Sequence, residues 1–142
     1  MMSFLQNLAQ ELQISESVIF HGKIESYEEV LRMIGHSHFL IHPAIHEAFG
    51  NVCLESLAIG KPVVCLDIGG PATQVTKECG FAAPIKNNED MILSIADFLE
   101  KSVKDNGFYQ NLSNNCYQRV QKHFSIESLM PAFEKMVVQS IA

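Results

Sequence analysis

Positive charge is scarce in this chain of 142 residues, in which ten lysines and arginines are outnumbered by sixteen aspartates and glutamates. The formal net charge is −6, and the basic residues form no cluster along the sequence. Proteins that bind nucleic acid usually carry a basic stripe that contacts the phosphate backbone. The composition therefore argues against nucleic-acid binding, and an anionic ligand would need local hydrogen-bond donors instead.

Closely spaced cysteine pairs and long apolar runs are also missing. The four cysteines, Cys53, Cys65, Cys79 and Cys116, lie far apart with no CxxC pair, so we expect reduced thiols buried in a core. No apolar run approaches the roughly 20 residues of a membrane-spanning helix. The amphipathic stretch Ser3–Leu12 is unlike a signal peptide. We therefore expect a cytoplasmic protein.

Hydrophobic residues make up 47% of the chain and charged residues 18%, which suits one soluble globular domain over residues 1–142. Apolar residues at helical spacing alternate with short continuous apolar runs, a pattern that predicts helices between buried strands. The predicted helices are Ser3–Leu12, Tyr27–Ile34, Val52–Ile59 and Met91–Val103, and the predicted strands are Val18–Phe20, Phe39–Ile41, Pro62–Leu66 and Phe81–Ile85. This alternation is typical of an α/β fold with a Rossmann-like, doubly wound parallel sheet.

The two ends of the chain depart from that pattern. The sequence opens on a helix where a doubly wound unit normally opens on a strand, so we expect a domain that lacks its first strand or is a fragment. From Asp105 onward the sequence is typical of helix. Pro131 predicts a kink in the last helix, or a late start of that helix near Ser128.

The segment EAFGNVCLE places two carboxylates, Glu47 and Glu55, on either side of a predicted helix start. It follows a predicted strand, and ligands of open parallel sheets bind at the carboxyl ends of strands. We expect Asn51 to cap the helix, so that free amides of Val52 and Cys53 can bind an anion such as a diphosphate. The two carboxylates would accept hydrogen bonds from sugar hydroxyls. Two glutamates taken alone more commonly have structural explanations. One is then a helix-start residue favoured by the helix dipole, and the other is a solvated loop residue.

The wider stretch HPAIHEAFGNVCLESLAIGKPVV, together with the later GGP, resembles the donor-binding C-terminal half of retaining GT-B glycosyltransferases of family four. The hallmark of that family is a Glu, seven residues and a second Glu. The resemblance rests on Pro43, Glu47, Phe49, Gly50, Leu54, Glu55, Ala58, Gly60, Pro62, Val63 and Val64, and more loosely on FHGKI at Phe20–Ile24 and on the Gly69-Gly70 turn. It implies a hexosyltransferase that takes its sugar from a nucleoside diphosphate sugar, retains the anomeric configuration, and needs no metal and no cofactor.

The resemblance also implies roles for individual residues. Glu47 would be the catalytic residue and contact the transferred sugar, and Glu55 would bind the ribose. Amides from Phe49 to Val52 would hold the sugar and the diphosphate, and the nucleobase would lie near Lys23 and Ile24. The full set of implied donor-binding residues is Lys23, Ile24, His46, Glu47, Ala48, Phe49, Gly50, Asn51, Val52 and Glu55.

The chain departs from the family pattern at several places. Ala44 stands where a small hydroxyl residue is usual, and Gln74 stands where a Glu commonly follows the double glycine. The family's Arg and Lys that neutralise the diphosphate belong to a strand and loop that precede this chain, and the N-terminal acceptor-binding domain is absent as well. We therefore expect little or no transferase activity from the chain alone.

For the full-length protein the resemblance implies a role in polysaccharide, lipopolysaccharide or glycolipid synthesis. Its expected partners are a nucleotide sugar and its own N-terminal acceptor-binding domain, and peripheral membrane association is a further option. A different class of function also stays open, namely a stand-alone, non-catalytic α/β module that binds a nucleotide or a protein. A sugar epimerase with the GT-B fold is less favoured, because the residues Phe49 and Gly50 lie between the two glutamates.

Three smaller motifs have ordinary explanations beside functional ones. His36, His38, His42 and His46 are close in sequence, and His42 and His46 would share a face of a helix and suggest a metal site. Pro43 argues against that helix, so strand-end and loop histidines are favoured. Cys53 near a helix start is a conceivable nucleophile, although a packing role suits it better. Gly69-Gly70-Pro71 either binds phosphate or turns the chain.

Overall fold

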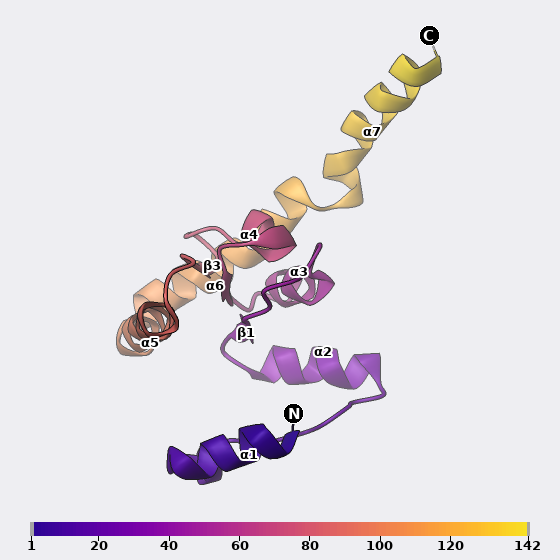
Figure 1. Cartoon of the computed structure of the whole chain (residues 1–142). Helices are drawn as coiled ribbons and strands as arrows, with labels where there is room; N and C mark the ends of the chain where they lie inside the picture. Colours follow the sequence, from indigo (N-terminus) through magenta and orange to yellow (C-terminus); the bar gives the residue numbers. More distant parts are fainter. Residues whose placement is uncertain (1, 142) are drawn as a thin grey trace. The chain divides into compact units, whose positions relative to one another are not determined.

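The structure, a computed structural model, describes residues 2–141 and divides into two compact units, Met1–Val30 and Leu31–Ala142 (Figure 1). The single domain expected over residues 1–142 stays a prediction. No helix in the described range is long and apolar enough to cross a membrane.

The first unit contains helix α1 (Met2–Glu11), which confirms the helix predicted for Ser3–Leu12, and the short 3-10 helix η1 (Ser15–Ser17). The strand predicted for Val18–Phe20 is wrong. Val18 has an extended backbone, with φ −120° and ψ 121°, but no described strand pairs with this segment. A strand needs a neighbour to accept and donate its backbone hydrogen bonds, and without one the extended segment forms no sheet.

The second unit is built on three parallel strands in the order β1-β2-β3, which are Leu40–His42, Val63–Leu66 and Gly80–Ala83. The strands predicted from the apolar runs exist, with ends that differ by one or two residues. Pro62 lies just outside β2, although its carbonyl accepts a hydrogen bond from the Leu40 amide (3.1 Å). All four residues of β2 are buried, as expected for the centre of a parallel sheet.

Helices cover both faces of this sheet. Helix α2 (Tyr27–His36) precedes β1, and helices α3 (Asn51–Ala58), α4 (Gly69–Gln74), α5 (Asn88–Lys104) and α6 (Asn106–His123) lie between and after the strands. A buried core packs against one face and consists of Cys53, Leu57, Val63, Cys65, Val75, Cys79 and Cys116. On the other face Phe98 of α5 stacks on Phe81 of β3, with ring centroids 5.0 Å apart. The layered α/β architecture confirms the predicted fold class.

Three side chains of α6 donate hydrogen bonds to the carbonyls that precede the three strands. The pairs are Tyr109 with His38 (3.2 Å), Ser113 with Gly60 (2.7 Å) and Asn115 with Glu78 (3.2 Å). These bonds tie α6 to the amino edge of the sheet. The loops that follow β1 and β2 therefore lie at the opposite, carboxyl edge, where ligands of parallel sheets bind.

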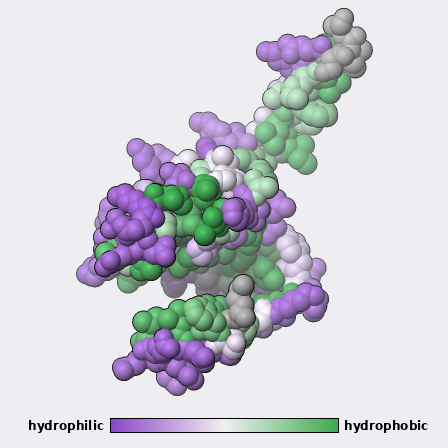
Figure 2. Space-filling model, viewed as in Figure 1, coloured by the Kyte–Doolittle hydropathy of each residue, from purple (hydrophilic) through white to green (hydrophobic). Residues whose placement is uncertain are grey.

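The last helix, α7 (Ile126–Ile141), begins two residues before the predicted late start at Ser128. Ser125 caps it, because its Oγ accepts a hydrogen bond from the Ser128 amide (3.1 Å). Pro131 lies inside α7, whereas the preceding helix α6 ends at His123, with Phe124 as its C-cap. Exposed apolar side chains such as Ile126 and Phe133 give α7 a hydrophobic surface (Figure 2).

Candidate functional site

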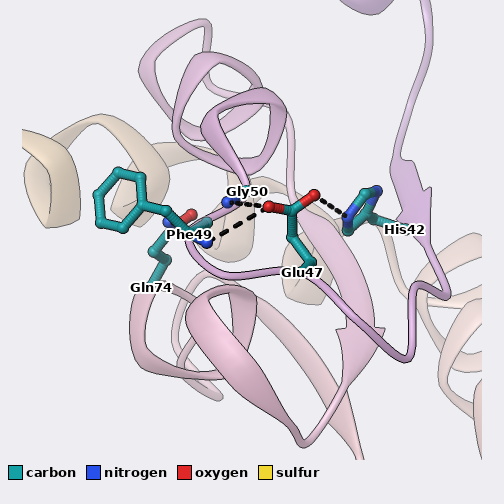
Figure 3. A network of polar contacts seen from close by, with 5 residues as sticks. All are labelled: His42, Glu47, Phe49, Gly50 and Gln74. Carbon is teal, nitrogen blue, oxygen red and sulfur yellow. Dashed lines mark hydrogen bonds and ion pairs between the residues drawn. The ribbon is translucent and has the colours of Figure 1, made fainter.

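Glu47 lies in the loop after β1, at the carboxyl edge of the sheet. Its Oε1 accepts hydrogen bonds from the amides of Phe49 (3.3 Å) and Gly50 (3.1 Å), as Figure 3 shows. Its own carbonyl accepts a bond from the Gly70 amide (3.1 Å). The side chain is 35% exposed, so the carboxylate is held in place and is still open to solvent.

Gly50 occupies the N-cap position of α3, with φ 81° and ψ 60°. The prediction that Asn51 caps this helix is therefore wrong, and Asn51 is the first helical residue. A left-handed backbone conformation favours glycine, and here it turns the chain so that the Gly50 amide faces the Glu47 carboxylate. The bonds to Glu47 hold the Phe49–Gly50 turn that leads into α3, and among the described residues no side chain caps this helix.

The amides predicted to bind an anion are only partly free. The Cys53 amide donates to the Gly50 carbonyl (2.9 Å), so the prediction for Cys53 is wrong: the left-handed Gly50 brings its carbonyl within reach. The amides of Phe49 and Gly50 already donate to Glu47. Within residues 2–141, the amides of Asn51 and Val52 have no protein acceptor. These two amides are the open donors at the start of α3.

The loop after β2 packs directly on the backbone of the loop after β1. α4 begins at Gly69, where φ is 67°. A Cβ added at Gly69 would lie 2.5 Å from the Glu47 carbonyl oxygen, and a Cβ at Gly70 would overlap the Cα and the carbonyl oxygen of Phe49. Of the two explanations of this double glycine, close approach in a turn is supported, because the Gly70 amide is already bonded to Glu47.

Gln74, the last residue of α4, holds the Phe49 peptide from the other side. Its side chain is completely buried, and its Nε2 donates to the Phe49 carbonyl, while its Oε1 has no partner. Arg119 of α6 fixes this end of α4 by donating to the carbonyls of Gln74 (3.1 Å) and Thr73 (2.9 Å). The sequence marked Gln74 only as a departure from the family pattern and gave no signal of this contact.

His42, the last residue of β1, is the second contact that the sequence did not predict. Its Nε2 lies 3.9 Å from Oε2 of Glu47, which is too long for a hydrogen bond. This nitrogen is buried and has no hydrogen-bond partner. Across residues 2–141, no three His, Cys, Asp or Glu side chains lie close enough together to hold a metal ion. That donor binding needs no metal stays a prediction.

The remaining predicted site residues differ in how far the structure places them. Glu55 is the fifth residue of α3, is half-buried, and has no partner in the described part of the chain. His46 and Ala48 are exposed in the loop after β1. Lys23 and Ile24 belong to the first unit, where Lys23 pairs with Glu25 (2.8 Å). The proposed roles of these residues stay predictions.

Cys53 is not an activated nucleophile. Burial, reinforced by the nearby charge of Glu47, raises the pKa of its thiol to about 11. The thiol therefore stays protonated at neutral pH, and the nucleophile alternative is contradicted. All four cysteines are free and buried, which confirms the expected packing role.

Comparison with known proteins agrees with this fold. The family described as Glycosyl transferases group 1 matches residues 2–122. An uncharacterized glycosyltransferase of Methanocaldococcus jannaschii is 28% identical over 142 residues, which is 100% of this chain and 35% of that protein. The chain thus spans about a third of the length of this curated relative.

Solved structures show the same architecture. Sucrose-phosphate synthase from Thermosynechococcus elongatus superposes with a TM-score of 0.76 at 25% identity, over 96% of this chain and 33% of that one. The C-terminal domain of a glycosyl transferase group 1 family protein from Francisella tularensis gives 0.73 at 22% identity, over 87% and 62%. These neighbours are glycosyltransferases of the GT-B fold, which confirms the resemblance drawn from the sequence. The chain belongs to the group 1 glycosyl transferase family.

Proposed function

We propose that this chain is the donor-binding domain of a retaining glycosyltransferase and that it binds a nucleoside diphosphate sugar at the carboxyl edge of its sheet. The observation that carries the proposal is the state of Glu47. Two backbone amides fix its carboxylate immediately before two open amides, those of Asn51 and Val52. A fixed acceptor next to open donors matches a sugar joined to a diphosphate.

The transferred sugar lies against Glu47 in this proposal. Oε1 is already bonded to Phe49 and Gly50, so Oε2 is the atom that accepts a sugar hydroxyl. Because the carboxylate is held before the donor arrives, little conformational freedom is lost on binding. His46 and Ala48, which are exposed in the same loop, complete the sugar side of the site.

The diphosphate lies at the start of α3. The open amides of Asn51 and Val52 and the positive end of the helix dipole attract its negative charge. The chain itself has a net charge of −6 and no basic cluster, so further cations come from the segment that precedes it in the full-length protein. For this reason we propose that the 142-residue chain alone has little or no transferase activity.

The ribose lies one turn further along α3, at Glu55. Residues four apart share a helix face, so Glu55 follows Asn51 at a rise of about 6 Å along the helix axis. The Glu55 carboxylate has no partner within residues 2–141 and is therefore available to the ribose diol. For the nucleobase, the family resemblance implies contacts with Lys23 and Ile24 of the first unit.

The reaction that follows from this arrangement is hexosyl transfer with retention of configuration. The leaving diphosphate assists deprotonation of the acceptor, no metal or cofactor takes part, and electrostatic stabilisation of the leaving group is a large part of catalysis. The missing N-terminal domain supplies the acceptor site. We propose a cytoplasmic enzyme of polysaccharide, lipopolysaccharide or glycolipid synthesis, in line with four free cysteines, with peripheral membrane association through the full-length protein as an option.

A screen of UDP-, GDP- and ADP-sugars against the full-length protein tests this function. We expect one nucleotide class to raise the thermal unfolding temperature, and we expect turnover to give a product with the donor's anomeric configuration by NMR. Stabilisation by a bare nucleotide or a protein partner, with no response to any sugar nucleotide, would favour the stand-alone module instead. Inversion of configuration would contradict the retaining mechanism.

A further inference from the structure

The two oxygens of the Glu47 carboxylate have different surroundings. Oε1 accepts two hydrogen bonds, from the amides of Phe49 and Gly50. Oε2 accepts none from residues 2–141, and Nε2 of His42 lies 3.9 Å from it. That nitrogen is itself buried without a hydrogen-bond partner. A buried polar nitrogen left unpaired beside an unfilled carboxylate oxygen is costly and calls for an explanation.

Counting acceptor positions gives that explanation. An ionised carboxylate offers about four lone-pair positions, two on each oxygen. The two amides fill the positions on Oε1, so two remain on Oε2. Nε2 of His42 lies 3.9 Å from Oε2, and the Glu47 side chain is 35% exposed, so Oε2 is within reach of both His42 and a ligand in solution.

We propose that His42 is a positioning residue for Glu47 and that its Nε2–H donates to Oε2 in the donor-bound state. This inference rests on the proposed function. Closing the gap from 3.9 Å needs a movement of about 1 Å to reach hydrogen-bond distance. With that bond made, Oε2 keeps one position, which accepts a single hydroxyl of the transferred sugar.

The position of His42 in the fold suits this role. It is the last residue of β1, and its neighbour across the sheet is Cys65 of the buried central strand. The Glu47 loop is otherwise held from the segment after β2, by the Gly70 amide and by the buried side chain of Gln74. A bond from His42 would tie the carboxylate to the rigid sheet, and rigid support is what keeps a binding group in its productive geometry.

Two substitutions of similar polarity distinguish a positioning role of His42 from a packing role. In His42→Gln the side-chain amide nitrogen reaches about as far as Nε2, whereas in His42→Asn it reaches only as far as Nδ1. We expect His42→Asn to weaken binding of the sugar nucleotide to the full-length protein by about tenfold, the usual size of a hydrogen bond to a charged group. His42→Gln should bind within about twofold of the wild type, and neither variant should change the acceptor KM.

A double-mutant cycle with Glu47→Gln shows whether His42 acts through Glu47. The glutamine keeps the oxygen that faces the amides and replaces Oε2 by an NH2 group, which accepts nothing from His42. We therefore expect His42→Asn to have no further effect in the Glu47→Gln background. Calorimetric titration measures the affinity of all four proteins for the sugar nucleotide selected by the screen. The four proteins are compared at matched thermal stability.

The outcomes separate the two proposals. Tenfold weakening in His42→Asn, rescue in His42→Gln and loss of the effect in the Glu47→Gln background together support positioning. Equal losses in both His42 variants, additive effects with Glu47→Gln, or wild-type binding by His42→Asn would each overturn it. If the wild type binds no sugar nucleotide at all, the proposed function fails, and positioning by His42 fails with it.

Discussion

The amide of Gly70 donates a hydrogen bond of 3.1 Å to the carbonyl of Glu47, and this bond joins the loop after β2 to the loop after β1. Gln74 strengthens the junction from the end of α4 by donating to the Phe49 carbonyl. The candidate donor site is therefore formed by two loops that support each other at the carboxyl edge of the sheet. Substitutions in the loop after β2 should therefore alter the loop after β1, although the loop after β2 makes none of the proposed donor contacts.

Gly70→Ala should lower both stability and donor affinity. The new Cβ would overlap the backbone of Phe49, which cannot move aside as the end of a flexible side chain can. We expect the free energy of unfolding to fall by about 2 kcal/mol or more in urea titrations. Gly35→Ala is the matched control, because its Cβ would meet only Ile59, at 3.7 Å, and alanine favours helix. Equal stability of the two variants would show that the loops are not tightly packed.

Gln74→Glu should destabilise the protein more than Gln74→Met. Both variants lose the donor to the Phe49 carbonyl, at a cost of about 1 kcal/mol, and the glutamate also places a carboxylate in a completely buried position. Chemical denaturation measures the difference, with Gln110→Glu on the exposed side of α6 as the control. A stable Gln74→Glu variant would mean that the Phe49 carbonyl does not need this donor.

The buried thiols should make the protein less stable in alkaline solution. Burial raises the pKa of Cys65 and Cys116 to about 12, and that of Cys53 to about 11. Unfolded thiols ionise at about 8.5. Between the unfolded and the folded pKa, the folded state keeps thiol protons that the unfolded state has lost. The free energy of unfolding therefore falls as the pH rises above about 8.5, by up to about 1.4 kcal/mol per thiol per pH unit.

Urea unfolding at pH 7, 9 and 10 measures this loss. The free energy of unfolding should be nearly constant up to about pH 8 as far as the thiols are concerned, and should then fall. Alkylation by iodoacetamide at neutral pH should also need unfolding. A free energy that is unchanged at pH 10, or rapid alkylation of the native protein, would contradict burial of the protonated thiols.

Much of this architecture follows from the sequence, because apolar periodicity reports burial directly. The three strands of the sheet and the helices between them appear where the pattern places them. The failures have local causes: the apolar run Val18–Phe20 has no neighbouring strand, and Asn51 lost the cap position because Gly50 adopts a left-handed turn. Residue preferences along one chain carry no information about which strands pair.

The site could be predicted only at the level of its segment. EAFGNVCLE marks Glu47, which lies in the loop after β1 as expected, and the start of α3, which comes one residue earlier than predicted. That Glu47 accepts from the amides of Phe49 and Gly50 depends on the turn between them. The contacts of Gln74 and His42 depend on the meeting of separate loops and strands, for which a single sequence has no signal.

Glu55→Gln should weaken binding of a nucleoside diphosphate and of the matching sugar nucleotide by the same factor. The ribose is common to both ligands, and losing the charged acceptor should cost about tenfold in affinity. The 2′-deoxy nucleotide is the control on the ligand side, since it should bind the wild type and the variant more equally. Unchanged affinity in Glu55→Gln would remove the ribose assignment.

The central claim, that Glu47 holds the transferred sugar, is tested most directly by calorimetric titration of the full-length wild type and Glu47→Gln with two ligands. Glutamine keeps the acceptor for the Phe49 and Gly50 amides, so α3 should start normally. We predict about tenfold weaker binding of the sugar nucleotide, and binding of the nucleoside diphosphate within about twofold of the wild type. Equal weakening for both ligands, or none for either, would contradict the claim.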